Sequence, residues 1–295
     1  MLRRELAEAL HREYMDFFEK AERNRRWNIW DDVPWEELDQ ERRHPELALC
    51  AETFLGVEMY VPDYIAQGLE CVRDSSKGQA WFQACWGYEE SKHSLVLREY
   101  LLRSGHRSPA AMYDFEQAIL EKRWARPFEA VRQMTMYGII QEMATLVIYK
   151  KQSRRAMAAG DKPLTKIFQL IARDEAAHAR FYINVVNLLM AEDRDGCVAD
   201  LAHVFRNFQM PGVELVPEYD ARVEVMRAGG VDRGVFIEEV WFPIIKRLGV
   251  TRRELARAAR QRAEREAKKA EAAEGTGLEH AAGGEGGLRE ADVAS

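Results

Sequence analysis

The runs Glu89-Glu90-Ser91-Lys92-His93 and Asp174-Glu175-Ala176-Ala177-His178 each place a histidine three residues after a glutamate. On an α-helix, residues at this spacing lie about 60° apart around the axis and about 4.5 Å apart along it. A carboxylate and an imidazole so placed project from one face toward a single point, as the ligands of a metal ion do. One such pair is a weak indication. Two pairs, each on an apolar helical stretch, predict a metal site inside a helical protein.

Two further glutamates are isolated within apolar sequence. Glu142 is the only charged residue between Arg132 and Lys150, and Glu52 is the only one between Glu46 and Glu58. A buried carboxylate without a partner costs several kcal/mol, so it must be protonated, paired with a cation or bound to a metal. We interpret both as metal ligands. The alternative is that the lone glutamates form salt bridges and the Glu-x-x-His pairs lie on the surface.

The spacing of these residues fits two helical hairpins. Glu52 and Glu90 are 38 residues apart, and Glu142 and Glu175 are 33 apart. In two antiparallel helices joined by a short loop, side chains at equal depth lie about 14–17 residues on either side of the turn. The 52 residues between Glu90 and Glu142 leave room for a crossover with a helix of its own. The predicted ligands are Glu52, Glu90, His93, Glu142, Glu175 and His178.

The chain of 295 residues has a helical apolar period up to about residue 250, without a convincing alternating strand. The predicted fold class is all-α, a ferritin-like antiparallel four-helix bundle with additional helices and a di-iron centre in the bundle. We expect one helical domain over 1–250, a charged helix over 251–272 and a disordered tail over 273–295. The expected helices cover 2–22, 45–73, 76–104, 109–124, 127–158 and 163–192, with shorter ones over 196–250.

Composition excludes several classes of function. The formal net charge is −6, which disfavours nucleic acid as a partner. No apolar run is long enough to span a membrane, and no signal peptide is apparent. The four cysteines form no Cys-x-x-Cys pair, so we interpret them as reduced core residues of a cytoplasmic protein.

The ligand set indicates the metal. Four carboxylates and two imidazoles suit iron or manganese and disfavour a thiolate-type zinc or copper site. Ferritin-like di-iron proteins carry this same combination of ligands. We therefore predict two Fe²⁺ ions per chain, whose charge would neutralise the four carboxylates.

Two neighbouring residues are candidates for supporting roles. Asp174 precedes Glu175, so it points about 100° away and could accept the free N–H of a ligand histidine, most simply His93. Its alternative is an ordinary surface aspartate. Thr145 follows Glu142 by one turn, and its hydroxyl could point toward a metal-bound oxygen. The alternative for Thr145 is a hydrogen bond to the carbonyl of residue i−4.

At these residues the sequence resembles the soluble acyl-acyl-carrier-protein desaturases of plant plastid and bacterial type. The similarity covers about residues 1–250 and includes a tryptophan-rich connector, Trp27-Asn28 to Pro34-Trp35. The ligand motifs are shared by the wider ferritin-like superfamily, whereas their spacing, Thr145, Asp174 and the connector narrow the resemblance. The shared motifs are Glu52-Thr53, Glu89 to His93, Glu142 to Thr145 and Asp174 to His178.

The resemblance implies a cytosolic homodimer that uses O₂ and two electrons, usually from ferredoxin. It implies removal of two hydrogens from a saturated fatty-acyl chain on acyl carrier protein, leaving a cis double bond. Thr145 would assist oxygen activation, and Trp27, His93 and Asp174 would line an electron route. Candidate docking residues for the acidic carrier are Lys122, Arg123 and Arg126, or Lys150, Lys151, Arg154 and Arg155.

We also expect a narrow apolar substrate channel lined by Phe54, Trp86, Met143 and Phe181. Three other functions fit the ligand pattern: a di-iron oxygenase acting on a carrier-bound or small-molecule substrate, a non-catalytic iron-binding or ferroxidase protein, and a radical-generating reductase subunit. The last would need a tyrosine beside the cluster, for which Tyr88 and Tyr149 are candidates. Chain length, double-bond position and the physiological electron donor are not encoded in these motifs.

Overall fold

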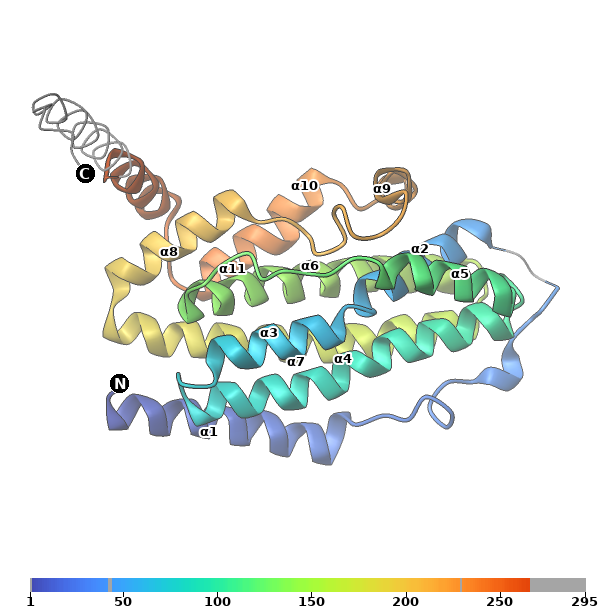
Figure 1. Ribbon diagram of the computed structural model, residues 1–295, viewed down its shortest axis with the longest axis horizontal. Helices are drawn as coiled ribbons and strands as arrows, with labels where there is room; N and C mark the ends of the chain where they lie inside the picture. The colour runs from blue at the N-terminus through green and yellow to red at the C-terminus, as the bar shows by residue number, and fades with distance from the viewer. Residues whose placement is uncertain (1, 42–43, 229, 266–295) are drawn as a thin grey trace, which may run out of the picture.

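The computed structural model describes residues 2–41, 44–228 and 230–265, and all regular elements among them are helices (Figure 1). The first half contains α1 (Arg4–Lys20), the π-helical turn η1 (Ala21–Arg25), η2 (Trp35–Glu37), α2 (Pro45–Glu58), α3 (Val61–Val72), α4 (Lys77–Arg103) and α5 (Pro109–Leu120). The second half contains α6 (Val131–Ala158), α7 (Lys162–Glu192), α8 (Arg194–Asn207), α9 (Tyr219–Ala228), α10 (Arg233–Val235), η3 (Phe236–Trp241) and α11 (Phe242–Arg247).

The centre of the molecule is a bundle of long helices. Helices α6 and α7 form the most extensively packed hairpin, while α2 and α3 pack one after the other along α4 (Figure 1). Helix α1 covers α4 and α7 from outside the bundle. The predicted all-α, ferritin-like bundle with additional helices is therefore confirmed, and α5 lies in the crossover between the two hairpins as expected.

Local sequence explains where the helices begin and turn. The side chains of Ser76, Ser108 and Asp161 each accept a backbone N–H in the first turn of α4, α5 and α7. These caps satisfy amide groups that the helix itself leaves unpaired. Gly160, between α6 and α7, has a φ of 76°, in the left-handed region that glycine tolerates best.

The predicted helix over 45–73 is wrong as a single element. It is divided at Met59 and Tyr60 into α2 and α3, and Pro62 lies in the first turn of α3. Proline has no N–H to donate to the carbonyl four residues earlier, that of Glu58, and its ring disfavours continuation of the preceding helix. Helix α2 therefore ends at Glu58, and this break alters the ligand geometry described below.

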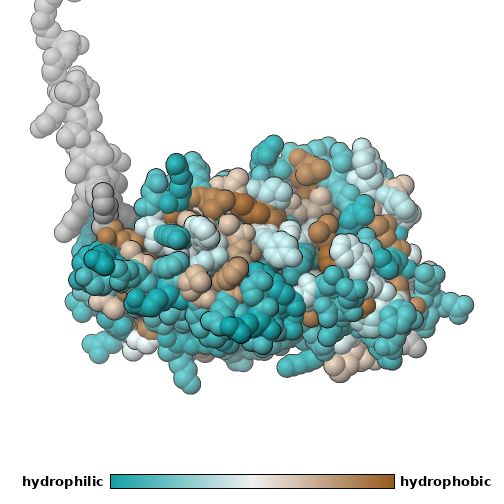
Figure 2. All heavy atoms as spheres, turned by 90° about the horizontal axis from the view of Figure 1, so that it is seen from below, coloured by the Kyte–Doolittle hydropathy of each residue, from teal (hydrophilic) through white to brown (hydrophobic). Residues whose placement is uncertain are grey.

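Beyond the bundle, residues 252–265 form a helix, in agreement with the start of the predicted charged segment. The predicted tail over 273–295 lies outside the described residues. On the face shown in Figure 2, polar and charged residues predominate and hydrophobic residues form separate patches. None of the described helices combines the length and the apolar character needed to cross a membrane.

Candidate metal centre

Six acidic and imidazole side chains from four helices meet in the middle of the bundle. Glu58 comes from α2, Glu90 and His93 from α4, Glu142 from α6, and Glu175 and His178 from α7. All six are buried, with no more than 4% of any residue exposed. Five of them are predicted ligands: Glu90, His93, Glu142, Glu175 and His178.

The six side chains form two overlapping groups. Glu58, Glu90, His93 and Glu175 offer ligand atoms within 4.8 Å of one another, and so do Glu90, Glu142, Glu175 and His178. Glu90 and Glu175 belong to both groups. Each group supplies carboxylate oxygens and one imidazole nitrogen, which is the donor set that iron and manganese accept. Each group would hold one metal ion of a pair, with Glu90 and Glu175 available to both ions.

The structure does not bring Glu52, predicted as a ligand, into the cluster, and Glu58 lies there instead. The Glu52 carboxylate is bound by Arg107, with its Nη2 at 3.1 Å, and by Arg222, with its Nη1 at 2.8 Å. This is the salt-bridge alternative that the sequence left open for the lone glutamates. The prediction assumed one uninterrupted helix over 45–73. Because α2 stops at Glu58, the residue of α2 that lies level with Glu90 of α4 is nearer to it in sequence than that helix implied.

A signal in the sequence could have identified Glu58. The interval from Glu58 to Glu90 is 32 residues, almost the same as the 33 from Glu142 to Glu175. Glu52 lies 38 residues from Glu90, which places it about 1.7 helical turns too far along α2 for a matching hairpin. Glu58 was hidden because it ends the apolar run and resembles an ordinary helix-terminal charge.

Each histidine is oriented by a carboxylate from the opposite helix. His93 has its Nδ1 3.1 Å from Glu90, while its Nε2 is 3.4 Å from Asp174. His178 has its Nδ1 3.0 Å from Glu90, while its Nε2 is 2.7 Å from Glu89. Nδ1 therefore faces the cluster and Nε2–H donates outward, which fixes the tautomer. The predicted contact between Asp174 and His93 is confirmed, and Asp174 is not a surface residue.

Glu89 was not predicted, although its position mirrors that of Asp174. Both residues immediately precede a Glu-x-x-His glutamate, so both point about 100° away from the cluster on their own helices. In an antiparallel pair, this direction leads to the histidine of the other helix. The repeated acidic pair, Glu89-Glu90 and Asp174-Glu175, was the available signal.

A buried arginine connects the two outer carboxylates. The Nη1 of Arg25, at the end of η1, lies 2.7 Å from Glu89 and 2.9 Å from Asp174. The indole N–H of Trp27 donates to Asp174 at 2.7 Å, and Arg26 contacts Glu89. Arg25 is only 8% exposed. The N-terminal segment therefore supports both histidines of the cluster at once, a role that the sequence analysis missed for Arg25.

The pKa shifts of the cluster residues show how the buried negative charge is balanced. Burial and the nearby charge of Glu90 raise the pKa of Glu58 well above its ordinary value, and burial with Glu90 and Glu142 does the same for Glu175. Burial disfavours the charged form of His93 and of His178, but the surrounding carboxylates outweigh it and raise both pKa values well above normal. Protons thus offset the negative charge that divalent cations would offset equally well.

Glu90 provides a second test of fit. Its pKa falls to about 2 because His93 and His178 outweigh the opposing effect of burial. Its buried Oε1 lies 3.0 Å from the Nδ1 of His178, an ion-pair contact that lacks hydrogen-bond geometry, and it accepts no hydrogen bond from the described residues. A buried carboxylate oxygen without a donor is costly, and a metal ion at this point would satisfy it. The residues therefore fit a two-metal centre.

Thr145 is close to the cluster, but its hydroxyl has another partner. Its Oγ1 donates to the carbonyl of Gln141 at 3.0 Å and lies 3.1 Å from that of Glu142. This is the helix-internal alternative for Thr145. Of the two tyrosines considered beside the cluster, Tyr149 is fully buried and donates to Glu58 at 2.9 Å, whereas Tyr88 is 56% exposed.

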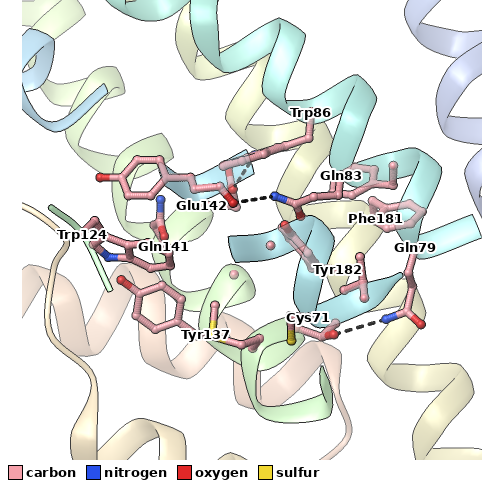
Figure 3. Close-up of a pocket in the computed structure, with 17 residues that line it drawn as sticks. Cys71, Gln79, Gln83, Trp86, Trp124, Tyr137, Gln141, Glu142, Phe181 and Tyr182 are labelled. Atoms are coloured by element: carbon pink, nitrogen blue, oxygen red, sulfur yellow. Dashed lines mark hydrogen bonds between the residues drawn. The ribbon is translucent and has the colours of Figure 1, made fainter. Parts of the chain in front are cut away.

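A pocket leads from α3, α4 and α6 to Glu142 (Figure 3). Trp86 and Phe181 line it as predicted, and the indole N–H of Trp86 donates to Glu142 at 3.0 Å. Phe54 and Met143 do not line it; Phe54 packs on Tyr149 instead. The exposed wall of the pocket is mainly apolar, as predicted, and glutamine and tyrosine side chains add a few polar groups to it.

Sequence comparisons identify similar curated proteins. A putative acyl-[acyl-carrier-protein] desaturase, DesA1, from Mycobacterium tuberculosis is 24% identical over 251 residues, covering 77% of this chain and 72% of the relative. The chloroplastic stearoyl-[acyl-carrier-protein] 9-desaturase 2 of Arabidopsis thaliana is 30% identical over 148 residues, covering 47% of this chain and 35% of the relative.

Solved structures share the fold. The putative acyl-ACP desaturase DesA2 from Mycobacterium tuberculosis superimposes with a TM-score of 0.63 at 17% identity, covering 86% of this chain and 98% of that one. An R2-like ligand-binding oxidase with an Fe/Fe cofactor gives a TM-score of 0.56 at 18% identity, with 81% and 93% covered. The family model described as fatty acid desaturase matches residues 57–272, which is most of the sequence. The chain belongs to the fatty acid desaturase family represented by this model.

Proposed function

We propose that this protein is an O₂-dependent di-iron desaturase that introduces a cis double bond into a saturated acyl chain carried on acyl carrier protein. The observation that carries the proposal is the pair of overlapping ligand groups at the end of a pocket. The names of the relatives, acyl- and stearoyl-[acyl-carrier-protein] desaturases, support the reaction and the carrier. The metal-bearing R2-like oxidases support a two-metal cofactor.

Two Fe²⁺ ions would be held by Glu58, Glu90, His93 and Glu175 on one side and by Glu90, Glu142, Glu175 and His178 on the other. When bound, such a pair supplies the oxidising power that an unactivated C–H bond requires. The protein's own contribution is position and exclusion. Glu89 and Asp174 hold the histidine rings, and the buried bundle keeps bulk water from the reacting carbons.

The proposed reaction consumes one O₂, two electrons and two protons for each chain oxidised. Two hydrogens leave adjacent carbons, a carbon–carbon double bond forms, and O₂ is reduced to two molecules of water. A ferredoxin-type donor would supply the electrons. Trp27, Asp174 and His93 form a continuous set of contacts, at 2.7 and 3.4 Å, from the N-terminal segment to the cluster. This supports the electron route expected from the family resemblance.

Thr145 stays a proposed contributor to oxygen activation. Thr145 is buried and lies one helical turn beyond Glu142, but its hydroxyl bonds to the helix backbone. Thr145→Val separates the two roles, since valine keeps the shape and removes the hydroxyl. A role in turnover predicts a rate about ten-fold lower with unchanged iron content. An unchanged rate would show that the hydroxyl serves only in its hydrogen bond to the Gln141 carbonyl.

The pocket favours one of the two predicted docking clusters for acyl carrier protein. Trp124 lines the pocket, and its neighbours in the sequence include the first cluster, Lys122, Arg123 and Arg126. These cations are partly neutralised within the chain, because Arg123 contacts Asp63 and Arg126 contacts Glu129. The second cluster lies in the C-terminal half of α6. We therefore propose that the carrier docks at the first cluster.

A homodimer is part of the proposal. Trp81, Tyr88 and Leu95 recur every seven residues on α4, and each is more than half exposed. Seven residues are close to two helical turns, so the three side chains form one apolar stripe. A stripe of this kind suits burial against a second copy of the chain. We place the enzyme in the cytoplasm, with which its four free cysteines agree.

A di-iron oxygenase is the second candidate function. The glutamine and tyrosine side chains in the pocket wall favour it, because they offer hydrogen bonds that a plain saturated chain does not use. Both reactions would need the same ligands. The products distinguish them, since desaturation removes two hydrogens whereas oxygenation adds an oxygen atom.

The test is incubation of the iron-loaded protein with reduced ferredoxin, O₂ and a panel of saturated acyl carrier proteins, followed by mass spectrometry of the released acids. We expect a product two mass units below the substrate. Glu58→Ala is the matched negative control, because it removes a proposed ligand. An oxygenated product without an alkene would reject desaturation, and an unchanged rate of turnover by Glu58→Ala would reject the site.

A further inference from the structure

The pocket beside Glu142 has an unusual wall for a chain of methylene groups. Although most of its exposed surface is apolar, several lining residues carry a polar group on the side chain, among them Gln79, Gln83, Thr135, Tyr137, Gln141 and Tyr182. Figure 3 shows that Gln83 and Gln141 lie on either side of Glu142, on α4 and α6. A saturated acyl chain offers no hydrogen bond to any of them.

The outer part of this wall is satisfied within the protein. The amide nitrogen of Gln79 donates to Thr135 at 3.3 Å, and its carbonyl oxygen accepts from Ser75 and Ser76 at 3.0 and 3.1 Å. Tyr137 donates to the carbonyl of Gln209 at 3.4 Å. The contact between Gln79 and Thr135 joins α4 to α6, and these groups need no ligand.

The inner part is not satisfied. Gln83 donates its Nε2 to the carbonyl of Tyr64 at 3.4 Å, and because a carbonyl can only accept, this contact fixes the amide orientation. The Oε1 of Gln83 then accepts no hydrogen bond from any residue in the described part of the chain. The side-chain amide of Gln141 makes none with those residues either, although Gln141 is half-buried.

The position of Gln83 is built into the fold. Gly68, on α3, faces it so closely that a Cβ there would lie 2.4 Å from its Nε2. Any larger residue at this point would displace the amide. Gly138 makes a comparable space for the ring of Tyr182, where a Cβ would lie 2.8 Å away. The positions of Gln83 and Tyr182 therefore depend on two glycines that leave room for their side chains.

We propose that the acyl group oxidised here carries a hydroxyl, or another group that both donates and accepts hydrogen bonds, close to the reacting carbons. Its O–H would donate to the Oε1 of Gln83, and its oxygen would accept from the Nε2 of Gln141. Covering a polar group with methylenes leaves it unpaired at a cost of about 1–3 kcal/mol. A plain saturated chain incurs that cost twice, whereas a hydroxyl-bearing chain avoids it. This inference rests on the proposed function.

The test compares matched substrates. Iron-loaded protein is titrated without O₂ with acyl carrier proteins bearing saturated chains of six to eighteen carbons, and with the same chains hydroxylated at successive positions. Binding is followed by the fluorescence of the pocket tryptophans, and turnover is then started with O₂ and reduced ferredoxin. We expect at least one hydroxylated isomer to bind and react about ten-fold better than its plain counterpart.

The variants Gln83→Met and Gln141→Met remove the amides at nearly constant length. Gln141→Met loses no hydrogen bond made by its side chain within the described residues, so it should fold normally. Either variant should reduce the hydroxyl preference to about three-fold or less. Gln117→Met, on the exposed face of α5, is the control and should keep the preference.

The outcomes separate this inference from the proposed function. Equal or better use of plain chains by the unmodified protein would overturn the inference and leave desaturation intact. Selective binding of hydroxylated chains without an alkene product would overturn desaturation and leave the binding role of the glutamines intact. A preference that survives both methionine variants would overturn the assignment of Gln83 and Gln141.

Discussion

Helix α2 contains two buried glutamates that differ completely in their surroundings. Glu52 and Glu58 are each 4% exposed, and they lie less than two turns apart. Two arginines bind Glu52 and outweigh the effect of burial, so its pKa is lowered. Glu58 faces other carboxylates, and burial with the charge of Glu90 raises its pKa. An isolated carboxylate in an apolar run thus indicates that the side chain is buried. Whether it forms a salt bridge or suits a metal ion depends on the side chains that face it.

The largest expected effect is a difference in iron content between variants of Glu58 and of Glu52. Glu58→Ala should reduce bound iron from about two atoms per chain to about one, and lower turnover by more than about 100-fold, because one ligand group loses a carboxylate. Glu52→Gln should keep both iron atoms. Iron is measured by elemental analysis of the purified protein. The opposite pattern would restore Glu52 as the ligand.

The second effect concerns stability. Arg222→Leu should lower the free energy of unfolding by about 3 kcal/mol, since Glu52 would be left buried with Arg107 alone. Urea denaturation followed by far-UV circular dichroism measures the change. Arg227→Leu, an exposed arginine on the same helix, should change it by less than about 0.5 kcal/mol. Equal effects of the two variants would show that the Glu52 ion pairs do not stabilise the fold.

The third effect concerns iron affinity, which should depend on Arg25 and not on the arginines that bind Glu52. Arg25→Met should weaken iron binding by about 10–100-fold, because Glu89 and Asp174 would lose their shared partner and hold the histidines less firmly. The helical circular dichroism should be retained. A chelator competition assay measures the affinity, with Arg23→Met, exposed on the same segment, as the control. Unchanged iron affinity would reduce Arg25 to a packing role.

The smallest effect is a dependence on pH. A carboxylate whose pKa is lowered on folding stabilises the protein above its ordinary pKa of 4.5, and that contribution is lost as the pH falls through the lowered value. The stability difference between the unmodified protein and Glu52→Gln should therefore be constant near neutrality and shrink below about pH 4.5. The decline cannot exceed about 1.4 kcal/mol per pH unit. A difference that grows on acidification would contradict the lowered pKa.

Sequence alone predicted the bundle and most of the cluster, because both depend on local helical periodicity. Glu90 with His93, and Glu175 with His178, are fixed by spacing within one helix, and Asp174 by its neighbour. Glu58 was missed because its position depends on where α2 ends, which Pro62 determines from outside that helix. Arg25 was missed because only tertiary packing brings the N-terminal segment to the bundle core.

The shared position of Glu90 and Glu175 has a consequence for engineering. Each belongs to both ligand groups, whereas Glu58 and Glu142 each belong to one. Replacing a peripheral glutamate would leave three ligands around one metal, so a mononuclear protein is accessible by a single substitution. Replacing a central glutamate would damage both halves together. Redesign toward one-metal chemistry should therefore begin at the periphery of the cluster and retain its centre.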